Sequence, residues 1–136
     1  MTPMQIHDVK QSFALVAPIA DQAGALFYRR LFEVDPTLRP LFKGDIDAQS
    51  EKLMKTIATV VNSLDRLETI VPIVQALGVR HAGYGVAERH YETVGEALMW
   101  TLEQGLGAAF TPAVRQGWAT AYGLLADTMK AAARQA

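Results

Sequence analysis

Apolar residues recur at spacings of three and four along nearly the whole chain, and this pattern restricts the fold more than any other feature. The stretch from Val114 to Met129 illustrates it, with Trp118, Tyr122 and Leu125 on one helical face. Alternating apolar and polar runs bounded by turn pairs, which are typical of strands, are missing. The sequence therefore predicts an all-α protein.

Proline and glycine residues divide this pattern into six to eight helices of unequal length. Thr2-Pro3 and Thr111-Pro112 each combine a capping side chain with proline in the first turn, so each marks the start of a helix. The segment Lys43–Ile46 is expected to form a corner, after which Asp47 caps a long helix. The alanine-rich end, Ala131–Ala136, is expected to fray. Helices so unequal do not suit a symmetric four-helix bundle.

The chain has 136 residues, of which 50% are hydrophobic, and a formal net charge of −1. This length is enough for one compact core, so we expect a single domain over residues 1–136. Lysine and arginine are spread along the chain and form no basic stripe, which argues against a nucleic-acid partner. Because cysteine is absent, disulfides and thiolate metal sites are excluded.

The N-terminal residues 1–8 contain neither a basic region nor a continuous apolar run. No stretch of the chain reaches the roughly 20 apolar residues that a membrane span needs. We therefore expect a cytoplasmic protein with no membrane partner.

A single histidine stands between apolar residues in the short helical stretch 77–86. One nitrogen of a neutral imidazole can bind a metal while the other donates to a nearby acceptor. The carbonyl of Leu77, one helical turn before His81, is the candidate acceptor. The alternative interpretation is a core histidine with no metal.

The order and spacing of several motifs resemble those of bacterial single-domain globins, which are related to the globin half of flavohaemoglobins. These motifs are Leu26–Phe32, Arg39–Phe42, Gln49–Leu53, Arg80–Val86, His90–Gly95 and Trp118–Gly123. The resemblance extends over essentially the whole chain. It implies a globin fold of six to eight helices around a haem pocket, haem b (iron protoporphyrin IX) as the cofactor, and His81 as the proximal ligand of the iron.

The resemblance also implies that Tyr28 and Gln49 stabilise the ligand on the distal side. Tyr28 lies among apolar and aromatic residues, so its ring is expected to be buried and its hydroxyl to need a partner. Dioxygen gains partial negative charge at ferrous haem, so a donor there slows its loss. The amide of Gln49 can donate to the ligand and accept from Tyr28. The alternatives are an ordinary core tyrosine and a surface glutamine.

Further residues are expected around the haem on the same basis. The residues expected to pack on the porphyrin or line the ligand pocket are Phe42, Leu53, Leu77 and Val86. Lys52 and Arg80 are candidates for contacts with the propionates, and simple solvation is the alternative for both.

Tyr91 lies ten residues after His81. In the related globins a tyrosine at this spacing and a glutamate late in the last helix form a hydrogen-bond relay to the proximal imidazole. The matching position here is Ala133, so the carboxylate is missing and peroxidase-like chemistry is less favoured. Contact between Tyr91 and His81 and an ordinary core role for Tyr91 are both kept. His90, at the start of the helix expected over Ala87–Leu102, is placed beside the corner rather than at the iron.

The function expected from the resemblance is reversible O2 binding at ferrous iron, for storage or delivery, with nitric oxide detoxification as a further capacity. An alternative is a nitric oxide dioxygenase, an enzyme that depends on an external reductase. A third interpretation is a haem-free helical interaction module. The expected partners are O2, NO or other diatomic ligands, and both a monomer and a homodimer are compatible with the sequence.

Overall fold

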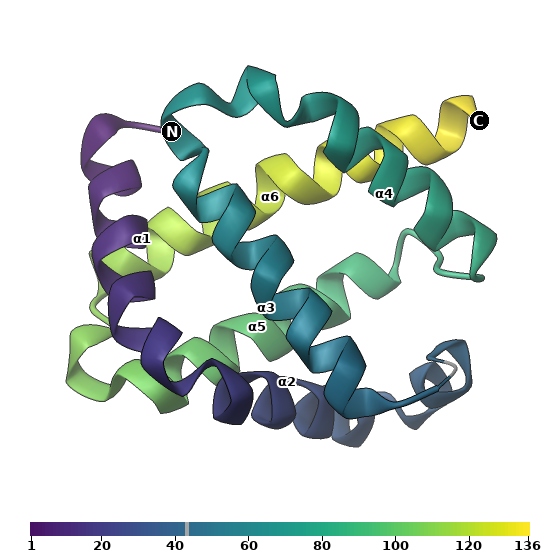
Figure 1. Cartoon of the computed structure of the whole chain (residues 1–136), viewed down its shortest axis with the longest axis horizontal. Helices are drawn as coiled ribbons and strands as arrows, with labels where there is room; N and C mark the ends of the chain where they lie inside the picture. Colours follow the sequence, from purple (N-terminus) through teal and green to yellow (C-terminus); the bar gives the residue numbers. More distant parts are fainter. Residues whose placement is uncertain (43) are drawn as a thin grey trace.

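A computed structural model describes residues 1–42 and 44–136 of the chain. In this part of the chain six α-helices and four 3₁₀ segments alternate with short connections, and no strand is present (Figure 1). The all-α class is therefore confirmed. Lys43, the first residue of the expected corner, lies outside the described residues. Over the same described ranges, no helix is long and apolar enough to cross a membrane.

The elements follow one another in a simple order along the chain. The α-helices are α1 (Pro3–Val16), α2 (Ala20–Val34), α3 (Ile46–Asn62), α4 (Val71–Gly83), α5 (His90–Leu106) and α6 (Pro112–Gln135). The 3₁₀ segments are η1 (Ala17–Ile19), η2 (Pro36–Leu41), η3 (Leu64–Thr69) and η4 (Gly107–Ala109).

Side-chain caps fix the starts of three helices. Thr2 and Gln5 form a capping box at α1, in which each side chain bonds the backbone N–H of the other residue at 3.1 Å. Thr111 caps α6 through its hydroxyl. The cap of α3 is Asp45, whose carboxylate accepts from the N–H of Asp47 at 3.0 Å. The prediction of Asp47 as the cap was wrong by two residues, because Asp47 lies in the first turn, where a negative charge is also favourable.

Two expected boundaries also differ from the structure. α6 continues to Gln135, so the alanine-rich end is helical rather than frayed. Alanine has the highest helix propensity, and the exposed Arg134 is paired with Glu88, which lies in the connection between α4 and α5. α5 begins at His90 rather than Ala87, because the His90 imidazole accepts the Ala87 N–H at 2.8 Å and ends the preceding loop.

The helices pack in two main groups. α6 packs against α4 and α1, whereas α2 packs against α5 and α3. In Figure 1, α2 runs along the bottom of the molecule and α4 lies at the upper right, beside the C-terminal half of α6. The helices that carry Tyr28 and His81 therefore belong to different groups.

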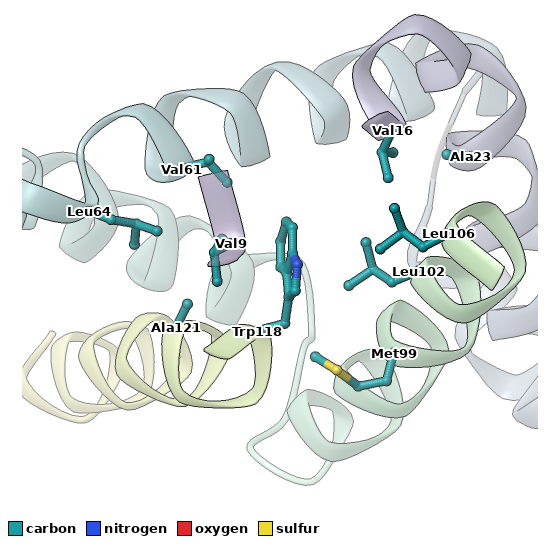
Figure 2. Close-up of a cluster of buried hydrophobic side chains, with 10 residues drawn as sticks. All are labelled: Val9, Val16, Ala23, Val61, Leu64, Met99, Leu102, Leu106, Trp118 and Ala121. Carbon is teal, nitrogen blue, oxygen red and sulfur yellow. The ribbon is translucent and has the colours of Figure 1, made fainter. Parts of the chain in front are cut away.

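The largest core cluster joins residues of five helices (Figure 2). Its buried members, which come from five α-helices and η3, are Val9, Val16, Ala23, Val61, Leu64, Met99, Leu102, Leu106, Trp118 and Ala121. The Trp118 indole N–H donates to Ser12 Oγ at 2.8 Å, and Ser12 Oγ donates in turn to the Asp8 carbonyl at 2.7 Å. The polar atoms in this core are therefore paired, as buried polar atoms generally are.

Two glycines allow close helix crossings. A Cβ added at Gly24 of α2 would lie 2.8 Å from the Cβ of Ser50 on α3. A Cβ added at Gly78 of α4 would lie 2.3 Å from the carbonyl oxygen of Met129 on α6. The second contact is with backbone, which cannot rotate away, so Gly78 sets the distance between α4 and α6.

We expect Gly78→Ala to lower the free energy of unfolding by about 2–4 kcal/mol, because the new methyl group must push α4 away from α6. Urea denaturation followed by circular dichroism measures this change. Gly123→Ala on α6 is the matched control, since no atom lies within 4 Å of an added Cβ there. The control should be stabilised by up to about 1 kcal/mol from helix propensity. Equal stability of Gly78→Ala and the native chain would contradict the close packing.

Candidate functional site

The imidazole of His81 is held by its own helix. Nδ1 lies 2.7 Å from the carbonyl oxygen of Leu77, one turn earlier on α4. Because a carbonyl can only accept, Nδ1 carries the proton of the neutral ring and Nε2 keeps its lone pair. Nε2 has no hydrogen-bond partner among the residues that the structure describes. The ring is therefore oriented by one nitrogen and free to bind a metal through the other.

The surroundings of His81 favour the neutral ring. Burial lowers the pKa of His81 below the ordinary histidine value, the bond to Leu77 raises it, and the charge of Arg80 lowers it. A pKa that is lower in the folded chain gives a stability contribution that is present above the pKa of the unfolded chain and lost as the pH falls. The form that folding favours is thus the form that binds metals.

Tyr28 is the central residue of an aromatic cluster on α2 and η2. Its side chain is 4% exposed, and its ring centre lies 5.0 Å from that of Phe27, 5.4 Å from that of Phe42 and 5.9 Å from that of Phe32. Its hydroxyl makes no hydrogen bond to any described residue, although a buried phenol normally has a partner. Burial raises the pKa of Tyr28 to about 12, so the hydroxyl stays protonated and can donate.

Gln49 and Leu53 lie one turn apart on α3, and both are half-buried. The side-chain amide of Gln49 forms no hydrogen bond within the described ranges, so it is not bonded to Tyr28. Leu53 packs against the cluster that contains Tyr28 and, together with Phe27, lines a small apolar cavity of about 20 Å³. α3 therefore supplies an unpaired amide and an apolar wall.

Phe42 and Val86 are each joined to one of the two principal residues. Phe42 meets the Tyr28 ring edge to face, with an interplanar angle of 75°. Val86 follows α4, and its backbone N–H donates to the carbonyl of His81 at 3.0 Å. Both side chains are half-buried. The structure thus groups Phe42 with Tyr28 and Val86 with His81.

Lys52 and Arg80 are exposed, on α3 and α4 respectively. Neither forms an ion pair with a residue in the described part of the chain. Both side chains are therefore at the surface with their charges available to an anionic group.

Tyr91 is the second residue of α5 and forms no hydrogen bond with His81. Its backbone carbonyl accepts from the hydroxyl of Tyr122 at 2.6 Å, and its side chain, like that of Leu77, packs against the buried cluster of Ile70, Val74 and Met129. Since Nδ1 of His81 is already bonded to Leu77, Tyr91 takes no hydrogen bond from the imidazole. Ala133 is half-buried on α6 and supplies no carboxylate. Among the described residues, the relay therefore lacks both the hydrogen bond between Tyr91 and His81 and the carboxylate at position 133.

Three residues near the site were not singled out from the sequence. The ring of Tyr84 is 64% exposed and its centre lies 6.3 Å from that of His81. Its spacing of three residues from His81 was a usable signal. The bond between Tyr122 and Tyr91 joins positions 31 apart, for which the sequence carries no signal. The third residue is Arg39, which begins the motif Arg39–Phe42 and was assigned no role of its own from the sequence.

The site offers one imidazole and no cluster of metal-binding side chains. Among the described residues, no group of three or more His, Cys, Asp or Glu could hold a metal ion. His90 is 7% exposed and its Nδ1 is taken by the Ala87 N–H. A single free imidazole suits a metal whose other ligands come from a prosthetic group. The fold and the donor set thus define the class of helical proteins with one histidine available to a haem iron.

The comparisons with known sequences identify the family. The family model for globins matches residues 25–129, and the chain belongs to the globin family. The chain is 33% identical over 120 residues to neuroglobin of Danio rerio, covering 78% of this chain and 76% of that protein. It is 32% identical over 125 residues to the flavohemoprotein of Bacillus subtilis, covering 90% of this chain. This chain spans only 31% of that flavohemoprotein.

Solved structures give the same result. The engineered carbene transferase RmaNOD, a proposed nitric oxide dioxygenase from Rhodothermus marinus, matches with a TM-score of 0.90 and 26% identity, covering 99% of this chain and 94% of that one. The bacterial globin of Campylobacter jejuni matches with a TM-score of 0.85 and 22% identity, covering 98% and 97% of the two chains. The globin fold and the resemblance to bacterial globins are therefore confirmed. Globins bind haem and diatomic ligands such as O2, so haem is the cofactor that the family implies.

Proposed function

We propose that the chain is a single globin domain, residues 1–136, that carries haem b and binds O2 reversibly at ferrous iron. The observation that supports this most is a pair of polar groups without protein partners, Nε2 of His81 on α4 and the hydroxyl of Tyr28 on α2. Among the described residues, the fully enclosed side-chain polar atom without a partner is Ser50 Oγ, so Nε2 of His81 and the Tyr28 hydroxyl are both reachable from outside the protein and open to a ligand. A haem with a diatomic ligand would satisfy both.

In this proposal His81 would hold the haem iron and Tyr28 would stabilise the ligand bound to it. The haem supplies the ferrous iron that takes up O2. His81 holds the iron through Nε2, and its bond to Leu77 keeps the ring from rotating. Tyr28 would donate a hydrogen bond from its hydroxyl to the bound ligand, and the Gln49 amide would provide a second donor.

The remaining residues enclose the cofactor. Phe42 and Leu53 exclude water from the distal side, and Leu77 and Val86 pack on the porphyrin. Lys52 and Arg80, both exposed, pair with the propionates. Tyr91 lies behind the proximal side as a packing residue.

The proximal side favours reversible binding over O–O cleavage. Strong electron donation to the iron would require an imidazole with anionic character, which a buried carboxylate produces by accepting its proton. Here the acceptor of His81 is the neutral carbonyl of Leu77, and Ala133 stands where the carboxylate would be. We place the protein in the cytoplasm, as a monomer or homodimer.

A second candidate function is nitric oxide dioxygenation. It is supported by two relatives, one named a flavohemoprotein and the other a proposed nitric oxide dioxygenase. In this reaction one NO, one O2 and one electron give nitrate, and a separate reductase restores the electron. Tyr28 and Gln49 would stabilise the same bound ligand, so the two candidates differ in the electron supply rather than in the pocket.

We expect His81→Ala to abolish stable haem incorporation, because the variant lacks the imidazole that would hold the iron. The Soret absorbance and a pyridine haemochrome assay of the purified protein measure the haem content and its b type. His7→Ala, at an exposed position on α1, is the control and should keep its haem. Stoichiometric haem with an unchanged spectrum in His81→Ala would reject the ligand assignment. A native protein with no Soret band would indicate the haem-free interaction module instead.

We expect Tyr28→Phe to raise the O2 dissociation rate by about one to two orders of magnitude, the scale of a lost hydrogen bond to a charged group. Stopped-flow displacement of O2 by CO gives this rate. Tyr84→Phe is the matched control, since its exposed ring lies beside His81 and should leave the rate within about twofold of the native value. An unchanged or slower rate in Tyr28→Phe would exclude Tyr28 as the donor.

We expect the oxygenated protein to consume about one NO per haem when no reductase is present, since one electron is available per iron. Stopped-flow absorbance with a nitrate assay, with and without a cellular reductase, measures this stoichiometry. Only slow further consumption with the reductase would favour O2 binding as the main role. Sustained turnover with the reductase would assign the chain to nitric oxide dioxygenation.

A further inference from the structure

Both backbone polar groups of Phe42 are bonded to one residue, Arg39. The Phe42 N–H donates to the backbone carbonyl of Arg39 at 3.1 Å. The Phe42 carbonyl accepts from Nη1 of the Arg39 guanidinium at 2.7 Å. A hydrogen bond from a charged donor is among the stronger ones in proteins. Arg39 therefore holds Phe42 at two points.

The same guanidinium also lies over the ring of Phe32. Its Cζ is 5.5 Å from the ring centre, which is within the range of a cation–π contact. Phe32 and Phe42 meet edge to face at 5.5 Å. One exposed side chain thus contacts both Phe32 and Phe42, the two rings that lie against Tyr28 from η2 and the end of α2.

The chain at this corner has few other means of fixing Phe42. Phe42 ends η2 in an extended conformation, with φ −102° and ψ 101°. η2 contains Pro36 and Pro40, neither of which can donate a backbone hydrogen bond. Stacking between rings is weakly directional, because edge and offset arrangements are close in energy. The hydrogen bonds of Arg39 are therefore the directional contacts that orient Phe42.

We propose that Arg39 is a positioning residue for the distal donor. It fixes Phe42 by hydrogen bonding and Phe32 by stacking, and these two rings hold the ring of Tyr28 so that its hydroxyl is aimed at the ligand. The effect on O2 rests on the proposed function, in which Tyr28 is the donor. The two hydrogen bonds between Arg39 and Phe42, which we call the clamp, do not depend on that function.

Arg30 provides an internal comparison. Its guanidinium lies 5.1 Å from the ring centre of Trp100, a stacking contact similar to that of Arg39. It donates no hydrogen bond to the corner among the contacts of the described residues. A variant of Arg30 thus removes a stacked cation between α2 and α5 without touching Phe42.

The first test measures amide hydrogen exchange at Phe42 by NMR, on the protein as purified. Arg39→Met should speed exchange of the Phe42 N–H by about tenfold, because the carbonyl side of the residue is released. Arg30→Met should leave that exchange unchanged. Equal exchange in Arg39→Met and the native protein would overturn the clamp, whatever the protein binds.

The second test measures the O2 dissociation rate of the ferrous protein. Arg39→Met should raise the O2 dissociation rate by about three- to tenfold. Arg39→Lys keeps a charged donor but loses the planar stack on Phe32, so it should raise the rate by a smaller factor. Arg30→Met should leave it unchanged. In a Tyr28→Phe background, Arg39→Met should add nothing further, since the effect passes through the Tyr28 hydroxyl.

The outcomes separate the two ideas. If Tyr28→Phe leaves the rate unchanged, the proposed donor fails while the exchange experiment still decides the clamp. If Tyr28→Phe raises the rate and Arg39→Met does not, or if the two effects add, the positioning role is overturned. If Arg39→Met does not fold with haem, Arg39→Lys takes its place in every comparison, and a rate equal to the native one then overturns the proposal.

Discussion

The contact between Gly78 and the backbone of Met129 is the constraint on which the proximal side of the site depends. α4 packs mainly against α6, so the depth of this one crossing sets the position of the helix that carries His81. The crossing of Gly24 and Ser50 does the same for α2 and α3, which carry Tyr28 and Gln49. Two close crossings in separate helix groups thus determine where the functional side chains lie.

Hydrogen bonding is not distributed evenly through the molecule. In the core, Trp118 is bonded to Ser12, and Tyr122 to the carbonyl of Tyr91. The hydroxyl of Tyr28 and Nε2 of His81 have no such partners within the described ranges, and the fully enclosed hydroxyl of Ser50 has none either. Packing can satisfy polar groups within this fold. The Tyr28 hydroxyl and Nε2 of His81 are not enclosed as Ser50 Oγ is, so both are open to a ligand, and the family implies haem.

The two sides of the site differ in how they are held. The orientation of His81 comes from its own helix, through a carbonyl four residues earlier. Tyr28 packs against the rings of Phe32 on α2 and Phe42 after η2, and the Arg39 guanidinium lies over the Phe32 ring and donates to the backbone carbonyl of Phe42. Under the proposed function, the neutral acceptor at Leu77 and the absence of a carboxylate at Ala133 would suit a site that holds and releases O2. The distal side would then control how quickly O2 leaves.

The sequence by itself determined the helical class, the caps at Thr2 and Thr111, and the bond from the His81 imidazole to the Leu77 carbonyl, because each depends on spacings within about one helical turn. It also indicated the site residues through the order of motifs. The start of α5 was missed although the His90–Ala87 bond spans only three residues, because histidine is not among the usual capping residues. The helical end of α6 was missed because the pairing of Arg134 with Glu88 depends on how the chain folds back. Only the tertiary structure decided which distant groups meet, and Arg39 can influence Tyr28 only because Phe42, the residue after η2, packs against the Tyr28 ring on α2.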